Sequence, residues 1–130
     1  MTQVSKFPLE KQIEVQIQEM FSNAICFVNE KGDVEKLLDD ILTPTERVML
    51  AKRLGIAVLL EKGYDYREIS EILKVSTTTI TTVAKWKKMR GGGYRKVVGM
   101  LLAQENWGHF FELVGEYLKE VRRGMGSYLK

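Results

Sequence analysis

Apolar residues recur at three- and four-residue steps along most of the chain, which is the period of an α-helix. Only two prolines occur, Pro8 and Pro44, and both stand where a helix would begin. The pattern predicts helices over residues 9–29, 34–41, 44–62, 66–73, 77–89, 94–104 and 107–123. We therefore expect an all-α protein with a single helical domain over residues 1–130, because a chain of 130 residues is too short for two large cores.

The first predicted helix, residues 9–29, has an apolar stripe that is wider than one narrow seam. The stripe consists of Leu9, Ile13, Ile17, Met20, Ala24 and Phe27, widened by Val15, Phe21, Ile25 and Val28. A helix this apolar in a small chain needs cover on more than one side. We therefore assign residues 1–42 to dimerisation helices and expect a homodimer; a core formed within one chain is the alternative.

Cys26 is the only cysteine, so no intrachain disulfide can form. It lies within the apolar stripe, and we expect it to be a small buried side chain. The N-terminus has no basic head followed by an apolar stretch, as a signal peptide would have. No apolar stretch approaches the ~20 residues of a membrane-spanning helix. These features together indicate a cytoplasmic protein without membrane segments.

Capping residues define the predicted helix ends. Thr43, Asp65 and Ser76 have the short oxygen-bearing side chains that accept hydrogen bonds from the first helical amides. Glu46 and Glu68 follow three residues after a cap and complete two capping boxes.

The third predicted helix should bury one face. That face consists of Val48, Leu50, Ala51, Leu54, Val58 and Leu59. Turns, stops and a further cap are predicted at Lys31-Gly32-Asp33, Gly63, Gly91-Gly92-Gly93 and Asn106.

Residues 66–89 have the spacing of a helix-turn-helix. With Tyr66 as the first position, apolar residues occupy positions four, eight, ten, fifteen and eighteen: Ile69, Leu73, Val75, Ile80 and Val83. At these offsets the two helices and their turn must contact one another and the core. The ninth position of such a motif is often glycine, because the backbone there turns left-handed, but here it is Lys74.

The threonine run of the second helix is ambiguous by itself. Threonine is β-branched and a poor helix former, so residues 76–83 are also compatible with a strand. The cap at Ser76, the glycines after Arg90 and the spacing of Ile80, Val83 and Ala84 favour a helix over residues 77–89.

Charge is distributed unevenly along the chain. Residues 1–40 contain 4 Lys/Arg and 8 Asp/Glu, whereas residues 41–130 contain 16 and 9. Between Glu71 and Glu105 there are 33 residues without any carboxylate. The seven basic residues among them are Lys74, Lys85, Lys87, Lys88, Arg90, Arg95 and Lys96. A helix-turn-helix inside such a stretch is typical of a protein that binds duplex DNA.

The predicted DNA-binding residues follow from the outward side of residues 77–89. Threonine hydroxyls and methyls can contact base edges in the major groove, and lysine and arginine can neutralise phosphates. The candidate residues are Arg53, Arg67, Ser76, Thr77, Thr78, Thr81, Thr82, Lys85, Lys87, Lys88 and Arg90. A basic face that only contacts solvent is the alternative interpretation.

The sequence contains few features that are typical of an enzyme. His109 is the only histidine and lies in a predicted amphipathic helix beside two phenylalanines. No Cys/His spacing typical of a metal site occurs, and Gly91-Gly92-Gly93 lies between helices rather than after a strand. We therefore expect no enzyme activity, no metal and no cofactor.

From about Leu37 to Lys88 the chain resembles the Trp repressor superfamily. The resemblance is carried by Leu37-Leu38, Ile41-Leu42-Thr43-Pro44-Thr45-Glu46-Arg47, Ala51-Lys52-Arg53, Lys62-Gly63, Arg67-Glu68-Ile69, Leu73 and Thr79-Ile80-Thr81. Gly92-Gly93-Tyr94 also resembles shorter relatives of that repressor. The resemblance implies an intertwined homodimer of helical bundles, operator binding by the helix-turn-helix, and tryptophan as corepressor. It places the core at residues 43–90 and leaves residues 91–130 as a helical extension.

The resemblance does not support tryptophan as the ligand here. It implies a clamp of two arginines around the corepressor. One of them corresponds to Arg53, but the other corresponds to Thr82, and the glycine after it corresponds to Val83. A neutral threonine bonds a carboxylate about half as strongly as a charged donor. Thr43 and Arg53 remain as candidate effector-binding residues, with the effector itself unknown.

The sequence therefore predicts a DNA-binding transcriptional regulator, a repressor by resemblance, that reads the major groove with residues 77–89. The alternative is a protein-interaction module that keeps the helical fold without binding DNA. RNA is the less favoured nucleic acid, because a helix does not fit the deep groove of A-form RNA.

Overall fold

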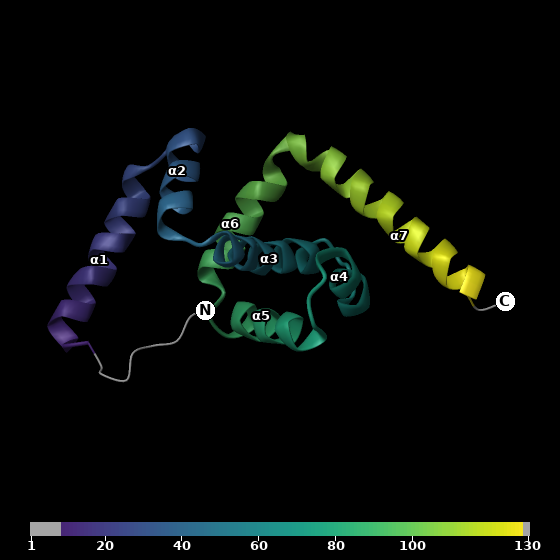
Figure 1. The fold of residues 1–130 in the computed structure, drawn as a ribbon, viewed down its shortest axis with the longest axis horizontal. Helices are drawn as coiled ribbons and strands as arrows, with labels where there is room; N and C mark the ends of the chain where they lie inside the picture. The colour runs from purple at the N-terminus through teal and green to yellow at the C-terminus, as the bar shows by residue number, and fades with distance from the viewer. Residues whose placement is uncertain (1–8, 129–130) are drawn as a thin grey trace. The chain divides into compact units, whose positions relative to one another are not determined.

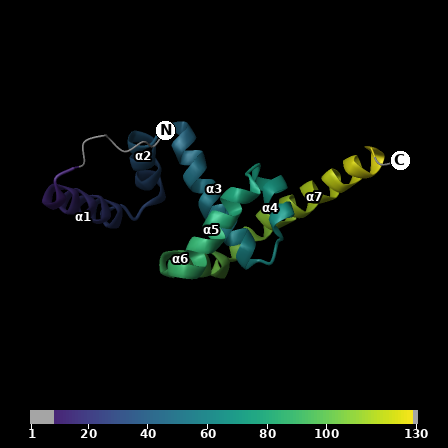
Figure 2. The same ribbon diagram turned by 90° about the horizontal axis from the view of Figure 1, so that it is seen from below.

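The computed structural model describes the backbone of residues 9–128 and their side chains except those of residue 105 and residues 125–128. That part of the chain is all-α, with seven α-helices, one short 3₁₀ helix and no strand. The helices are α1 (Lys11–Phe27), α2 (Lys31–Ile41), α3 (Pro44–Glu61), α4 (Tyr66–Leu73), α5 (Thr77–Arg90), α6 (Gly92–Ala103), η1 (Glu105–Trp107) and α7 (Gly108–Tyr128) (Figures 1 and 2). The predicted all-α class is confirmed. Among the described helices, none combines the length and apolar character needed to cross a membrane.

The chain divides into two compact units after Met49, so that α3 begins in the first unit and ends in the second. None of the described residues of the first unit is buried. On α1, Ile13, Ile17 and Phe21 are each about half exposed. Cys26 is also exposed, which corrects the expectation that it is buried. The first unit therefore has no core of its own in the single chain.

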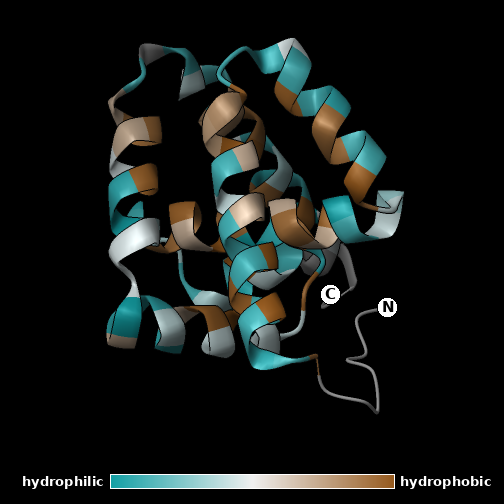
Figure 3. Cartoon of the chain, turned by 90° about the vertical axis from the view of Figure 1, so that its left-hand side faces the viewer, coloured by the Kyte–Doolittle hydropathy of each residue, from teal (hydrophilic) through white to brown (hydrophobic). Residues whose placement is uncertain are grey.

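The second unit contains the core. Its buried side chains come from α3, α4, α5 and α6, and they are Ile56, Ala57, Leu59, Ile69, Ile80, Val83 and Val98. Val114 and Leu118 of α7 are buried as well. Figure 3 shows the resulting alternation of hydrophobic and hydrophilic bands along the helices. The predicted buried face of α3 was wrong in part: Val48 and Leu50 are exposed, and the core side is formed by Ile56, Ala57 and Leu59.

The predicted capping boxes are confirmed. The Thr43 hydroxyl accepts a hydrogen bond from the Glu46 amide at 3.1 Å, and the Glu46 carboxylate accepts one from the Thr43 amide at 2.9 Å. These bonds hold the pKa of Glu46 below its ordinary value. Asp65 and Glu68 form the same arrangement at the start of α4, with bonds of 2.8 and 3.0 Å. Both boxes satisfy amides that have no partner within the helix.

Several predicted boundaries differ from the structure, and α7 continues to Tyr128 rather than ending at residue 123. Lys31-Gly32-Asp33 forms the first turn of α2 rather than a turn before it, and the helix begins after Glu30. Gly92 and Gly93 belong to α6, so that Gly91 alone separates α5 from α6. A side chain at Gly91 would place its Cβ 2.0 Å from the Lys87 carbonyl oxygen, which explains glycine there. Asn106 lies inside η1 and does not cap α7. Pro8 lies outside the described residues.

Candidate nucleic-acid interface

The helix-turn-helix predicted at residues 66–89 is present as α4, a short turn and α5. Ile69, Ile80 and Val83 are buried, and Leu73 and Val75 pack against them from the two sides of the turn. Lys74 adopts the left-handed conformation with φ of +54°. The motif therefore keeps its usual backbone at the ninth position although a lysine replaces the usual glycine.

A serine on α4 stabilises this turn. The Ser70 hydroxyl donates a hydrogen bond to the Val75 carbonyl at 2.6 Å, and the Val75 amide donates to the Ser70 carbonyl at 3.3 Å. These two hydrogen bonds fix the backbone on both sides of Lys74. No local pattern indicates this role, because a serine in a short amphipathic helix is commonly a surface residue.

The threonine run is helical, so the strand alternative is wrong. Ser76 caps α5: its hydroxyl accepts a hydrogen bond from the Thr79 amide at 3.1 Å. Further along, the Thr81 hydroxyl donates to the Thr77 carbonyl at 2.8 Å, and the Thr82 hydroxyl donates to the Thr78 carbonyl at 3.0 Å. Threonine in a helix commonly forms such bonds to the preceding turn.

The predicted base-contacting residues mostly share the exposed side of α5. Thr77, Thr78, Thr81 and Lys85 are exposed, whereas Thr82 is half-buried and lies closer to the core. Within the described part of the chain, the hydroxyl of Thr78 has no hydrogen-bond partner. Ser76 is exposed, but its hydroxyl is already used by the cap. The freely available hydroxyls on this side are therefore those of Thr77 and Thr78, with Thr81 still able to accept.

The predicted phosphate-binding cations differ in availability. Lys85, Lys88 and Arg90 are exposed on α5, and Arg67, which already interacts with another residue, is exposed on α4. Lys87 is different: its ammonium group lies 2.9 Å from the Glu61 carboxylate of α3, and its side chain is only 19% exposed. This bond holds the pKa of Glu61 below its ordinary value. Lys87 therefore links α5 to α3.

Arg53, a candidate for both DNA and effector binding, lies over an aromatic ring. Its guanidinium carbon is 6.0 Å from the centre of the Trp86 ring, and that of Arg90 is 5.1 Å from the same ring. Cations over tryptophan are attracted by the electrons of the ring face. Trp86 on α5 thus contacts an arginine of α3, while the Thr43 hydroxyl is engaged in the cap of α3.

The C-terminal helix contributes residues that the sequence did not identify. The Tyr117 hydroxyl of α7 contacts the Lys74 ammonium group and the Glu71 carboxylate, and the Arg122 guanidinium lies 3.2 Å from the Glu68 carboxylate. The bonds from Tyr117 and Glu71 raise the pKa of Lys74, and those from Lys74 and Tyr117 lower the pKa of Glu71. No short-range signal could reveal these contacts, because they join residues more than 40 positions apart.

These observations describe a helical unit built around a helix-turn-helix. Searches of curated proteins and of solved structures gave no match. A family profile does match: that of the Trp repressor protein covers residues 16–102, which include every residue of α4, α5 and the turn between them. Because this match extends over more than half of the chain, the protein belongs to the Trp repressor family.

Proposed function

We propose that this protein is a sequence-specific DNA-binding transcriptional regulator, a repressor by family, that reads the major groove with α5. The observation that carries the proposal is the surface of α5, where exposed threonines at its N-terminal half precede exposed cations at its C-terminal half. No carboxylate lies on this helix to repel phosphate. Membership of a family of non-enzymatic regulators supports the same function.

Base readout is assigned to Thr77, Thr78 and Thr81. Short side chains allow the helix to lie deep in the groove, and their hydroxyls can donate to or accept from base edges. Thr81 donates to the Thr77 carbonyl, so toward a base it acts as an acceptor. Thr78 has no such bond and can serve in either role. Thr82 is a minor contributor because it is half-buried.

Phosphate contacts are assigned to Lys85, Lys88 and Arg90 of α5 and to Arg67 of α4. The free amides at the start of α5, around Ser76, offer a further phosphate site. Lys87 contributes less, because binding a phosphate would break its ion pair with Glu61. Arg53 on α3 lies over the same Trp86 ring as Arg90, so it can also help to position α5.

We also propose that the protein acts as a homodimer. The first unit buries none of its described residues, although α1 carries a wide apolar stripe. Residues 1–42 of one chain would cover the corresponding apolar surface of a second copy. Two α5 helices would then enter successive major grooves about one helical turn apart, ~34 Å.

The same exposed apolar surface favours a second candidate function. A different protein could cover α1, and the chain would then be an interaction module that keeps the helix-turn-helix without binding DNA. The two functions make opposite predictions for DNA affinity, so one experiment separates them.

The test begins with selection of bound sequences from a pool of random duplexes. Affinity for a selected site is then measured against salt. A regulator should lose about 0.9 log unit of affinity per log unit of salt for each phosphate neutralised. Thr78→Ala should weaken binding to the selected site more than to random DNA, whereas Lys88→Ala should weaken both alike. Lys119→Ala removes an exposed cation from α7 and serves as the control. Absence of any selected sequence, with weak salt-independent binding, would favour the interaction module.

A further inference from the structure

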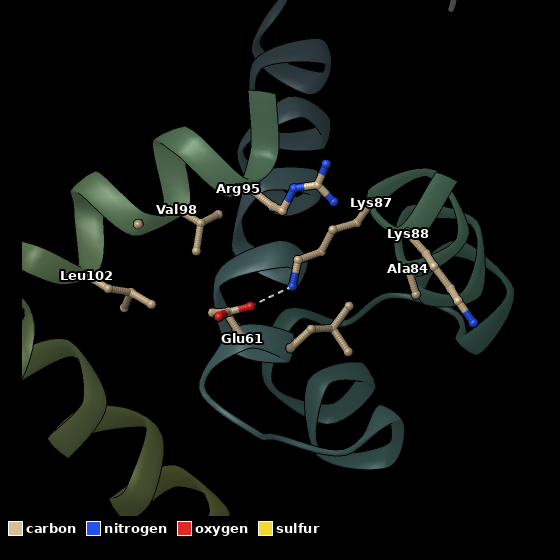
Figure 4. Close-up of a pocket in the computed structure, with 9 residues that line it drawn as sticks. Glu61, Ala84, Lys87, Lys88, Arg95, Val98 and Leu102 are labelled. Carbon is tan, nitrogen blue, oxygen red and sulfur yellow. Dashed lines mark hydrogen bonds and ion pairs between the residues drawn. The ribbon is translucent and has the colours of Figure 1, made fainter. Parts of the chain in front are cut away.

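A cavity of about 560 Å³ lies between α3, α5 and α6 (Figure 4). Its apolar wall is formed by Leu60, Ala84, Val98 and Leu102. Pockets that bind small molecules typically measure 300–1,000 Å³, with mostly apolar walls and a few polar groups. The volume is therefore in the range of small-molecule sites, and the wall carries four charged side chains beside the four apolar ones.

The polar lining of the cavity carries an excess of positive charge. Lys87, Lys88 and Arg95 line the cavity together with one carboxylate, that of Glu61, which already binds Lys87. Within the described part of the chain, the side chains of Arg95 and Lys88 have no hydrogen-bond or ion-pair partner. Figure 4 shows Arg95 extending from α6 and Lys87 from α5, with the Lys87–Glu61 bond crossing toward α3. Arg95 is thus the cation best placed to bind an incoming anion.

Gly99 keeps one side of this cavity open. It lines the cavity in the middle of α6, and a Cβ added there would meet no atom within 4 Å. Glycine in a helix interior destabilises the helix relative to alanine. No neighbouring atom requires a glycine at this position, but a large side chain there would fill the cavity.

The cavity is also separate from the apolar surface of α6 that a protein partner would cover. At 100° per residue, Arg95, Val98 and Leu102 lie on one side of α6, and the exposed Val97 and Met100 lie on the opposite side. A partner that covers Val97 and Met100 would leave the cavity open.

We propose that this cavity binds a small organic anion, a carboxylate with a compact apolar body. Its carboxylate binds Arg95, and its apolar part lies against Leu60, Val98 and Leu102. The anion would neutralise positive charge next to Lys88 and so lower the affinity for DNA, a consequence that rests on the proposed function. By linkage, DNA would lower the affinity for the anion by the same factor.

The first test uses protein without DNA and octanoate as the probe, observed by backbone amide NMR. Octanoate should shift the amides around Gly99 and Leu102 in a saturable way. Acetate, 1-octanol and octylamine should each bind much more weakly, because each lacks either the apolar body or the negative charge. Similar binding of octanoate and octylamine would overturn the proposal.

Variants then locate the site. Arg95→Gln should weaken octanoate binding about tenfold, through loss of a charge-assisted hydrogen bond. Lys96→Gln is the matched control, since it removes one exposed cation from the next residue of α6 outside the cavity. Gly99→Leu should abolish binding by filling the space. If Gly99→Leu does not fold, Arg95→Gln still decides, because Arg95 is exposed. Equal effects of Arg95→Gln and Lys96→Gln would refute the site.

The second test measures DNA affinity with and without saturating octanoate. Octanoate should weaken DNA binding by the wild-type protein, and the same weakening in Arg95→Gln should require about ten times more octanoate. Octanoate binding that leaves DNA affinity unchanged would overturn the regulatory part of the proposal. Failure to bind DNA at all would instead refute the proposed function, while the titration without DNA would still decide whether the site exists.

Discussion

Lys74, in the turn of the helix-turn-helix, donates a hydrogen bond from Nζ to the hydroxyl of Tyr117, 2.6 Å away and 43 residues later in the chain. The same ammonium group lies 2.9 Å from the Glu71 carboxylate and 5.3 Å from the centre of the Tyr117 ring. Tyr117 belongs to α7, which lies beyond the residues matched by the family profile. The C-terminal helix therefore contacts the element proposed to bind DNA.

Removal of the Tyr117 hydroxyl tests whether α7 stabilises the turn of the helix-turn-helix. Tyr117→Phe keeps the ring but loses the bonds to Lys74 and Glu71, so we expect a melting temperature lower by a few degrees. Hydrogen exchange at the amides of Lys74 and Val75 should become faster. Tyr66→Phe is the control, since Tyr66 is exposed and its hydroxyl has no partner in the described part of the chain. Equal exchange in the two variants would contradict a role for α7 at the turn.

The cap of α5 is expected to contribute measurably to stability. Ser76→Ala removes the oxygen that accepts the Thr79 amide, and the free energy of unfolding should fall by about 1 kcal/mol. Urea denaturation monitored by circular dichroism would measure the change. Thr77→Ala, one residue further on, removes a hydroxyl without a capping role and should leave stability unchanged or slightly higher. A similar loss in both variants would show that the cap is not the cause.

The apolar stripe of α1 should control the oligomeric state. The Phe21 side chain is 52% exposed in the single chain, so Phe21→Asp should not disturb the fold of one chain but should disrupt a dimer. Sedimentation velocity at micromolar concentration should show a dimer for the wild-type protein and a monomer for Phe21→Asp. Ser22→Asp introduces the same charge at the next exposed position and should remain dimeric. A wild-type monomer would remove the proposed architecture.

Acid should destabilise the protein through three glutamates. The pKa values of Glu46, Glu61 and Glu71 are lowered by hydrogen bonds from Thr43, Lys87 and Lys74 respectively. A carboxyl with a lowered pKa in the folded state stabilises the fold above the ordinary value of 4.5, and this contribution disappears as the pH falls through the lowered value. The free energy of unfolding, measured by urea denaturation from pH 7 down to pH 3, should fall as the pH is lowered. It should fall less in Glu71→Gln. Identical pH profiles would contradict the assignment for Glu71.

Tryptophan should not change DNA affinity. Arg53 already lies over the Trp86 ring, and Thr82 stands where the family resemblance places the second arginine. DNA affinity measured with and without saturating L-tryptophan should therefore be the same. A gain in affinity on adding tryptophan would show that the effector site of the family is retained.

Several features were predictable from the sequence because they depend on neighbours within one helical turn. The capping boxes of Thr43 with Glu46 and of Asp65 with Glu68 join residues three apart, and both are present. The bounds of α4 were predicted correctly for the same reason. The buried Ile80 and Val83 followed from spacing along α5. Local hydrogen bonding and helical periodicity thus determined the elements and the helix-turn-helix.

Tertiary structure alone decided which side chains are available at the candidate site. The sequence could not distinguish Lys87 from Lys85, yet Lys87 binds a glutamate 26 residues away while Lys85 is exposed. Likewise, the Lys74–Tyr117 contact and the cavity beside Arg95 depend on how helices cross, which no local pattern specifies. The chain by itself fixed which segments are helical, because that depends on short-range bonds; packing between distant segments decided which charges remain free.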